Sequence, residues 1–272
     1  MNHRILLITG TQNRHLSIAS KIISKFPVDW IQYKRKLVPQ EDKNYLSESD
    51  NNFLNSHLQN LQEDEVKAIG EYSLDTLTAK VINSSGRIIS IKGRNELNSL
   101  NTIRWAGETE YDLAIDYGSG IISKDLIEAI NAVIVNIHGG ISPYYKGSST
   151  LLYALLLSQP ELVGMTIHKI DEGIDSGDIY KHVLPVLHES MRPTEVFAEC
   201  QKQLILEINS IIEKIIKLEY LPQKQSKFGR TFMERDFRIN ALKSIYRDHE
   251  EGLLSDSIKM IKDNLKPYKL IL

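Results

Sequence analysis

Short apolar runs alternate along this chain with segments of helical periodicity, and this alternation constrains the fold more than any other feature. The runs ILLI (5–8) and AVIV (132–135) contain only apolar residues, as strands buried on both faces of a parallel sheet do. Residues 15–26, after the first run, repeat their apolar side chains at helical spacing. The pattern therefore predicts an α/β protein with a mostly parallel, twisted sheet flanked by helices.

The other expected elements follow from the same two periodicities. We expect further strands at residues 28–33, 111–118, 163–169 and 178–185. We expect helices at residues 46–73, 124–130, 194–217, 239–249 and 253–264. KVIN and RIISI flank the turn sequence at residues 84–86, which favours a strand, a turn and a second strand. Because the pattern becomes irregular after Tyr220, we predict a catalytic domain over residues 1–219 and a small helical C-terminal appendage over residues 220–272.

Composition excludes several classes of protein. The chain has 272 residues, of which 42% are hydrophobic, so it can bury a full core. Its formal net charge of −2 gives no indication of a nucleic-acid surface. The single cysteine, Cys200, excludes an internal disulfide, and because its neighbours have the pattern of a helix we expect it in the protein core. No apolar run approaches the roughly 20 residues of a membrane span, and the N-terminus lacks the pattern of a signal peptide, so we expect a cytoplasmic protein.

Three polar residues follow predicted strands at the edge where α/β proteins bind ligands. Asn136 and His138 end the run AVIV, and Asp175 lies in the acidic loop DEGIDSGD. An amide can donate a hydrogen bond to a developing oxyanion, an imidazole can move a proton, and a carboxylate can orient the imidazole or accept a proton. Such a set suits attack by an amine on a carbonyl carbon. On spacing alone, ordinary turn chemistry remains an alternative for all three residues.

The sequences NIHGGISPYYKGSST (136–150) and VGMTIHKIDEGIDSGDIY (163–180) together resemble the signature of the folate-dependent formyltransferases. The shared pattern is Asn-x-His, a Ser-Pro step and Tyr-x-Gly, then a Gly-x-Thr-x-His strand and an Asp-x-Gly loop. The resemblance is good over residues 111–180 and fainter beyond residue 217. It implies a Rossmann-like formyltransferase core in which Asn136, His138 and Asp175 are catalytic. It also implies 10-formyltetrahydrofolate as the formyl donor. We expect no metal, because the sequence contains no cluster of residues with metal-ligand spacing.

The same resemblance places the pterin of the donor against the backbone of two loops. Those loops are formed by Gly118, Gly120, Ile121 and Ile122, and by Asp171, Glu172, Gly173 and Ile174. Glycine at 118 and 120 would let the backbone approach a flat ring closely, although an ordinary strand-to-helix turn is the alternative. His168 lies within a predicted strand, and we expect it to be a structural histidine rather than a catalytic one.

The acceptor amine is predicted from a departure within the signature. His138-Gly139-Gly140-Ile141-Ser142-Pro143 replaces the His-Pro-Ser-Leu-Leu-Pro of better-known relatives. This form resembles bacterial enzymes that formylate nucleotide-linked amino sugars in surface-polysaccharide pathways, such as O-antigen biosynthesis. Candidate acceptor contacts are Gly10, Arg14, His15, Asn98, Tyr144, Tyr145 and Lys146. The turn at residues 9–15 suits an anion at a helix N-terminus, although solvent-facing capping is the alternative.

The sequence allows more than one role for two segments and more than one reaction for the whole chain. Residues 227–238 either cover the acceptor or form a homodimer interface, and the two tyrosines either stack on the acceptor or pack the loop. Other acceptors remain as alternatives: glycinamide ribonucleotide, hydroxyornithine or methionyl-tRNA. So do hydrolysis of the formyl folate and non-catalytic binding of a folate or a nucleotide sugar. Hydrolysis usually accompanies an N-terminal regulatory domain, which we do not expect before ILLI, and the intact catalytic set disfavours simple binding.

Overall fold

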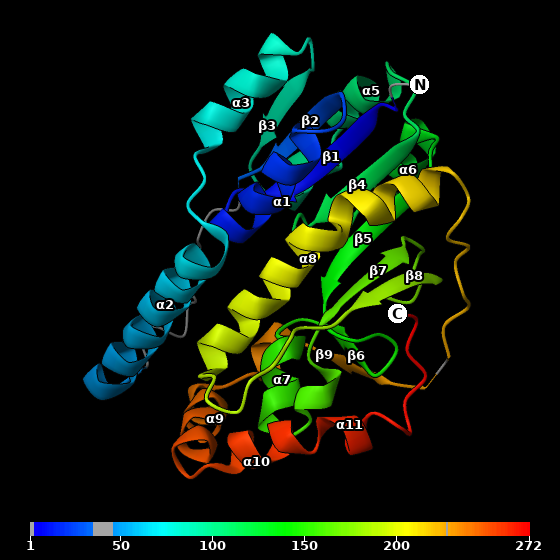
Figure 1. Cartoon of the computed structure of the whole chain (residues 1–272). Coiled ribbons are helices and arrows are strands. Elements are labelled where there is room, and N and C mark those ends of the chain that lie inside the picture. The colour runs from blue at the N-terminus through cyan, green and yellow to red at the C-terminus, as the bar shows by residue number, and fades with distance from the viewer. Residues whose placement is uncertain (1–2, 35–45, 227) are drawn as a thin grey trace.

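The computed structural model describes residues 3–34, 46–226 and 228–272. Its centre is a seven-stranded sheet with the order β3-β2-β1-β4-β5-β7-β8 (Figure 1). The strands are β1 (Ile5–Gly10), β2 (Val28–Tyr33), β3 (Ile88–Ile91), β4 (Leu113–Tyr117), β5 (Ile134–Gly139), β7 (Met165–Lys169) and β8 (Ile179–Val183). Strands β1 to β5 run parallel, whereas β7 and β8 are antiparallel to their neighbours. The predicted α/β fold with a mostly parallel sheet is therefore confirmed.

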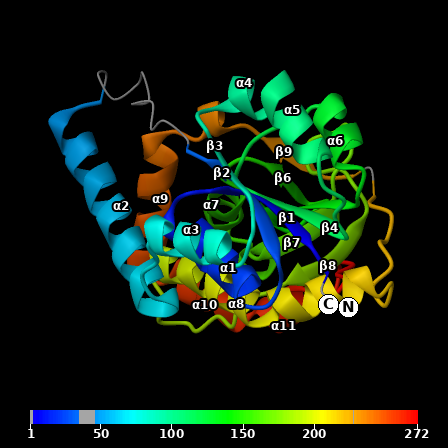
Figure 2. The same ribbon diagram turned by 90° about the horizontal axis from the view of Figure 1, so that it is seen from above.

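Helices cover both faces of the sheet, because its strands are apolar on both sides. On one face lie α1 (Asn13–Ile23), α3 (Leu74–Asn83) and α8 (Pro193–Ile216), and on the other α4 (Arg94–Leu97), α5 (Leu100–Gly107) and α6 (Lys124–Ile130) (Figure 2). Alternate residues of one strand enter different cores: Val135 packs in the α8 core and Ile134 in the α6 core. Helix α2 (Glu48–Ile69) packs beside α8. No helix among the described residues has the length and apolarity to cross a membrane.

The expected strand at KVIN is wrong, because these residues form the last turn of α3. The helix begins after Ser73, whose side chain accepts a hydrogen bond from the backbone N–H of Thr76. Its buried residues, Leu77 and Val81, are one helical turn apart. Four residues are too few to show their own periodicity, so this run alone does not distinguish a strand from the end of a helix.

Hydrogen bonds to one buried carboxylate link several strands at the edge opposite the carboxyl ends of the parallel strands. Asp29, at the start of β2, is fully buried. It accepts hydrogen bonds from Arg4 at 2.6 Å, from Tyr111 at 2.9 Å and from the Arg87 side chain at 2.8 Å. Burial alone would raise the pKa of Asp29, but these donors lower it below the usual value. The network joins residues that flank β1, β2, β3 and β4, so it stabilises their alignment.

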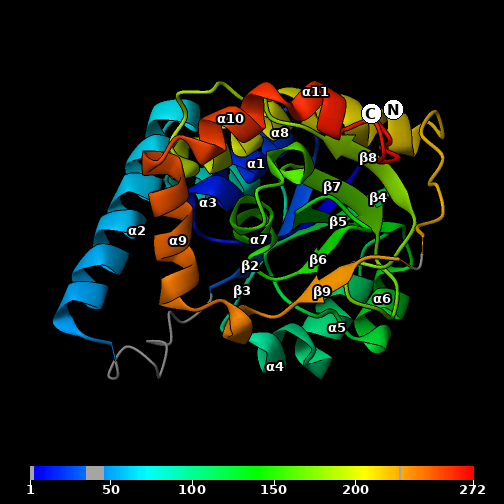
Figure 3. The same ribbon diagram turned by 90° about the horizontal axis from the view of Figure 1, so that it is seen from below.

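The C-terminal residues pack on the same core as the main sheet. They form β9 (Arg230–Phe232), which pairs in parallel with β6 (Tyr145–Gly147), and then α9 (Ile239–Glu250), α10 (Leu253–Lys259) and α11 (Ile261–Asn264) around α7 (Thr150–Leu156) (Figure 3). The single helix expected over 253–264 is divided at Met260. Ile245, Leu254 and Ile258 enter the α8 core. The predicted boundary between residues 219 and 220 stays a prediction, and Lys227 lies outside the described residues.

Candidate active site

A row of three polar side chains crosses neighbouring strands at the carboxyl end of the sheet. Asn136 on β5 is in register with Asp116 on β4 and with His168 on β7. His138 follows two positions later on β5, so it faces the same side of the sheet as Asn136. The sheet therefore brings a carboxyl, an amide and two imidazoles to one edge.

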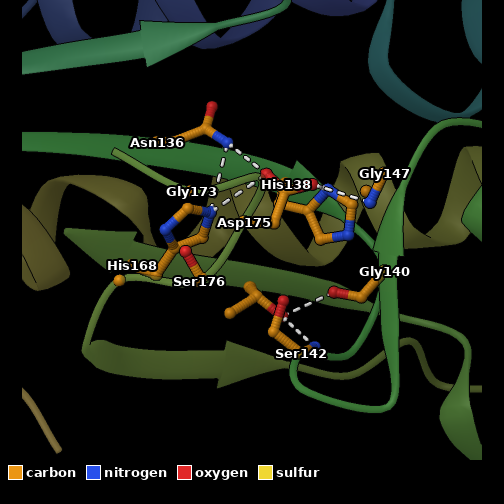
Figure 4. Close-up of polar contacts among 12 residues, drawn as sticks. Asn136, His138, Gly140, Ser142, Gly147, His168, Gly173, Asp175 and Ser176 are labelled. Carbon is orange, nitrogen blue, oxygen red and sulfur yellow. Dashed lines mark hydrogen bonds and ion pairs between the residues drawn. The ribbon is translucent and has the colours of Figure 1, made fainter. Parts of the chain in front are cut away.

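The acidic loop places Asp175 in the middle of this group (Figure 4). Its Oδ2 accepts a hydrogen bond from the backbone N–H of Gly147 at 2.8 Å and lies 3.3 Å from Nδ1 of His138. Its Oδ1 lies 3.1 Å from Nδ2 of Asn136 and 3.3 Å from Nε2 of His168. The structure thus brings together Asn136, His138 and Asp175, the three residues predicted to be catalytic, although 39 positions separate the first from the last.

The contacts of Asp175 keep it ionised. Burial alone would raise the pKa of this carboxyl, but the charge of His138 and the hydrogen bonds from His168 and from the Gly147 N–H lower it to about 2. A carboxylate can only accept hydrogen bonds, so the side-chain nitrogen of Asn136 must point toward it. The amide oxygen of Asn136 consequently points away from Asp175 (Figure 4).

His138 is enclosed, with 6% of its side chain exposed. Nε2 donates to the backbone carbonyl of Tyr145 at 2.9 Å, while Nδ1 faces Asp175. Burial lowers the pKa of His138, although the Asp175 charge and the Tyr145 carbonyl oppose that shift. A Cβ atom at Gly140 would lie 2.7 Å from Nε2, so only glycine leaves the ring in this position. A substrate oxygen can accept the Nε2 hydrogen bond only by replacing the Tyr145 carbonyl.

His168, which we expect to be structural, also contacts the candidate catalytic residues. Nδ1 donates to the carbonyl of Lys169 at 2.9 Å, so Nε2 accepts from the Asn136 amide at 3.2 Å in the neutral ring and donates to Oδ1 of Asp175 at 3.3 Å in the doubly protonated ring. His168 is therefore both a satisfied buried residue and a support for Asn136 and Asp175. Only the strand register, which the sequence does not reveal, places it there.

Asp116 was not singled out from the sequence, because it lies inside the mostly apolar run of β4. It is 4% exposed and accepts a hydrogen bond from the hydroxyl of Ser119. Burial raises the pKa of Asp116 to about 7; the nearby Asp175 charge adds to the shift, and Ser119 and His168 oppose it. An acidic residue in a strand that is buried on both faces was the available signal for this group.

The two loops expected to hold the pterin flank this group. Ile121 is 54% exposed and Ile174 is 46% exposed, so each loop offers an apolar side chain to solvent. Gly118 and Gly120 have positive φ angles, and a Cβ at Gly118 would lie 2.4 Å from Nε2 of His15. Of the other predicted residues, Gly120, Asp171, Glu172 and Gly173 are exposed, whereas Ile122 packs in the α6 core. Bare backbone beside an exposed isoleucine fits the face of a flat ring.

Asn98 supports one of these loops. Its Nδ2 donates to the carbonyl of Ile121 at 3.0 Å, and its Oδ1 accepts from the N–H of Ser123 at 2.7 Å. In the other loop, Oδ1 of Asp171 accepts from the N–H of Gly173 at 3.0 Å. Both side chains therefore fix loop conformation in this structure, and the predicted acceptor contact of Asn98 stays a prediction.

The remaining predicted acceptor residues lie in two places. At the start of α1, Arg14 pairs with Glu65 at 3.1 Å, and the ring of His15 fills the space between Gly10 and Gly118. Burial, aided by the charge of Arg14, lowers the pKa of His15 to about 3, so His15 offers no positive charge to an anion at neutral pH. The other place is β6 and the residue before it, where Tyr144, Tyr145 and Lys146 follow in sequence.

Part of this chain matches a known protein family. Residues 104–203, which contain Asn136, His138, His168 and Asp175, match the family model described as formyl transferase. Methionyl-tRNA formyltransferase of Methylacidiphilum infernorum is 36% identical over 85 residues, covering 30% of this chain and 26% of that protein. The enzyme of the same name from Syntrophomonas wolfei is 25% identical over 193 residues, covering 68% of this chain and 56% of that protein. The chain thus spans between about a quarter and just over half of these two relatives.

Solved structures share the fold at low sequence identity. A sugar N-formyltransferase from a Shewanella species superposes with a TM-score of 0.54 at 16% identity, over 86% of this chain and 78% of that one. An N-formyltransferase from Helicobacter canadensis, in complex with folinic acid and dTDP-3-aminofucose, gives a TM-score of 0.54 at 20% identity, over 86% and 72%. The chain therefore contains a formyl transferase domain over residues 104–203, carried on the fold of the formyltransferases.

Proposed function

We propose that this protein is a folate-dependent N-formyltransferase that acts on the amine of a nucleotide-linked amino deoxysugar. One observation carries the proposal. Nδ2 of Asn136 and Nδ1 of His138 both lie within 3.3 Å of the Asp175 carboxylate, inside the formyl transferase domain. The donor, 10-formyltetrahydrofolate, supplies a formyl group on nitrogen. The loops at residues 118–122 and 171–174 are the part of the chain that would hold its ring.

The orientation of Asn136 changes the role that we expected for it. Its Nδ2 is held by Asp175, so the amide oxygen is the group that remains to accept a hydrogen bond from the attacking amine. Stabilisation of the oxyanion then falls to Nε2 of His138, once the substrate oxygen takes the place of the Tyr145 carbonyl. Transfer moves one proton from the amine to the leaving nitrogen. Asp175 and His138, 3.3 Å apart, can accept that proton and return it.

The nature of the acceptor is supported by two lines of argument. The Gly139-Gly140 form of the loop resembles sugar-nucleotide enzymes, and one structural neighbour binds folinic acid with dTDP-3-aminofucose. The matched curated relatives are methionyl-tRNA formyltransferases, which keeps that acceptor as the alternative. A net charge of −2 gives little electrostatic attraction for tRNA. A surface-polysaccharide pathway, a cytoplasmic location, a homodimer and the contact of Arg14 with an acceptor anion stay predictions.

A panel of amines tests this function. The protein would be mixed with 10-formyltetrahydrofolate and thymidine-, uridine- or guanosine-linked amino deoxysugars, and in parallel with glycinamide ribonucleotide, hydroxyornithine and methionyl-tRNA. We expect one amino sugar to gain the mass of a formyl group. Formylation of another amine alone would replace the acceptor in our proposal, and release of free formate without transfer would indicate a hydrolase. Donor binding with neither product would contradict catalysis.

A further inference from the structure

A groove lies beside strand β6, next to the catalytic group in the sequence. It is a groove of about 570 Å³ between the β6–β9 pair, the end of α7 and the C-terminal segment. That volume is in the range of small-molecule sites, about 300–1,000 Å³. The groove is lined by Tyr144, Tyr145, Leu157, Gln159, Leu162, Gly229, Arg230, Phe232 and Tyr268.

Four aromatic rings line the groove and contact one another in pairs. Tyr145 stacks on Phe232 with ring centroids 5.3 Å apart, and Tyr144 meets Tyr268 edge to face at 4.9 Å. Gln159 joins the two sides, because it accepts from the hydroxyl of Tyr145 and donates to that of Tyr268. Because these contacts already fix the rings, a planar ligand ring can stack on them without the entropic cost of ordering the side chains.

Arg230 is the charged member of the groove lining. It is the cross-strand partner of Tyr145, so the two side chains leave the β6–β9 pair on the same face. Arg230 is exposed, and no described side chain forms an ion pair with it. An unengaged guanidinium beside aromatic rings suits a ligand that joins a ring to a phosphate group.

The groove and the catalytic group share one residue. The side chain of Tyr145 lines the groove, while its backbone carbonyl accepts the hydrogen bond from Nε2 of His138. Two positions later, the N–H of Gly147 donates to Asp175. A ligand in the groove therefore lies against β6. The same strand carries the Tyr145 carbonyl, which a substrate oxygen must replace as the acceptor for His138.

We propose that this groove binds the nucleoside diphosphate part of the acceptor, with the base against the aromatic wall and the diphosphate on Arg230. The identification of this nucleoside diphosphate as part of the acceptor rests on the proposed function. The benzoyl-glutamate part of a folate also joins a ring to an anion, so the test must separate the two sources. The loops proposed to hold the pterin follow β4 and β7, whereas residues of β6, of β9 and of the segments after α7 and α11 line this groove, which favours the nucleotide.

Calorimetric titration of the full chain with thymidine, uridine and guanosine diphosphates tests the groove. We expect at least one to bind the wild-type protein. We expect its Kd to rise about tenfold or more in Arg230→Ala, because a charge-assisted, forked contact is lost. Arg230→Lys, which keeps the charge without the fork, should give an intermediate Kd. Arg235→Ala is the matched control, because Arg235 is exposed nearby on the chain and outside the groove, and it should leave the Kd unchanged.

The outcomes separate this assignment from the proposed function. Weaker nucleoside diphosphate binding in Arg230→Ala, with unchanged folate binding, supports the groove whether or not formyl transfer is detected. Absence of nucleoside diphosphate binding to the wild-type protein overturns it. So does a loss of affinity for folate instead of nucleotide. Formyl transfer whose acceptor KM is unchanged in Arg230→Ala would also overturn the groove while leaving the proposed function intact.

Discussion

Replacing His138 with alanine should lower the kcat of formyl transfer by about 10³-fold, the middle of the range for loss of a proton-transferring group. The variant loses both the Nε2 donor for the oxyanion and the proton path to Asp175. Initial rates at saturating donor and amine measure the effect. His188→Ala is the matched control, because His188 is an exposed histidine that is hydrogen-bonded to Ser190. This substitution should leave kcat unchanged.

Loss of folding must be separated from loss of chemistry in this experiment. Circular dichroism and a thermal melt would show whether His138→Ala retains the native structure, and His138→Asn provides a second variant that keeps a polar group. A folded variant with near wild-type turnover would refute the role given to His138.

Replacing Asp116 with asparagine should stabilise the protein at pH 8 but not at low pH. The pKa of Asp116 is raised from 3.8 in the unfolded chain to about 7 in the folded one by burial. Between those values the folded state binds the extra proton, so wild-type stability falls as pH rises. About three units at roughly 1.4 kcal/mol each give a maximum of ~4 kcal/mol. Asparagine cannot ionise, and its amide oxygen can still accept from Ser119.

Urea unfolding of both proteins between pH 4 and pH 8 measures this difference. The expected result is a gap in the free energy of unfolding that opens through this window in favour of Asp116→Asn. Because Asp175, with its pKa lowered to about 2, is present in both proteins, its own loss of stability on acidification cancels. A gap that stays constant with pH would contradict a buried, proton-binding Asp116.

The sequence was informative where a single element carries its own periodicity. The strands at residues 5–10 and 134–139 could be predicted because the runs ILLI (5–8) and AVIV (132–135) are apolar at every position, as in strands buried on both faces. KVIN could not be assigned correctly, because four residues do not distinguish a strand from the end of a helix. Helix α3 was decided by Leu77 and Val81 packing against the core, which is tertiary information.

Some residues of the site could likewise be predicted from the sequence, and others could not. Asn136, His138 and Asp175 could be proposed from the sequence because their motifs resemble those of a known family. His168 and Asp116 depend on the strand register, which nothing local encodes. The contact of His138 with Tyr145 uses a backbone carbonyl, so no side-chain pattern could indicate it. The groove requires residues 229–232 and 268 to return to β6 and α7, a long-range contact that sequence periodicity cannot show.

The central claim is that His138 and Asp175 act as one unit on a single formyl group. The kcat values of His138→Ala, Asp175→Ala and the double variant test it most directly. Residues that act as a unit are strongly non-additive, so we expect the double variant to be about as slow as the slower single variant. If the two losses instead multiply, the side chains act independently, and the account of a shared proton path is wrong.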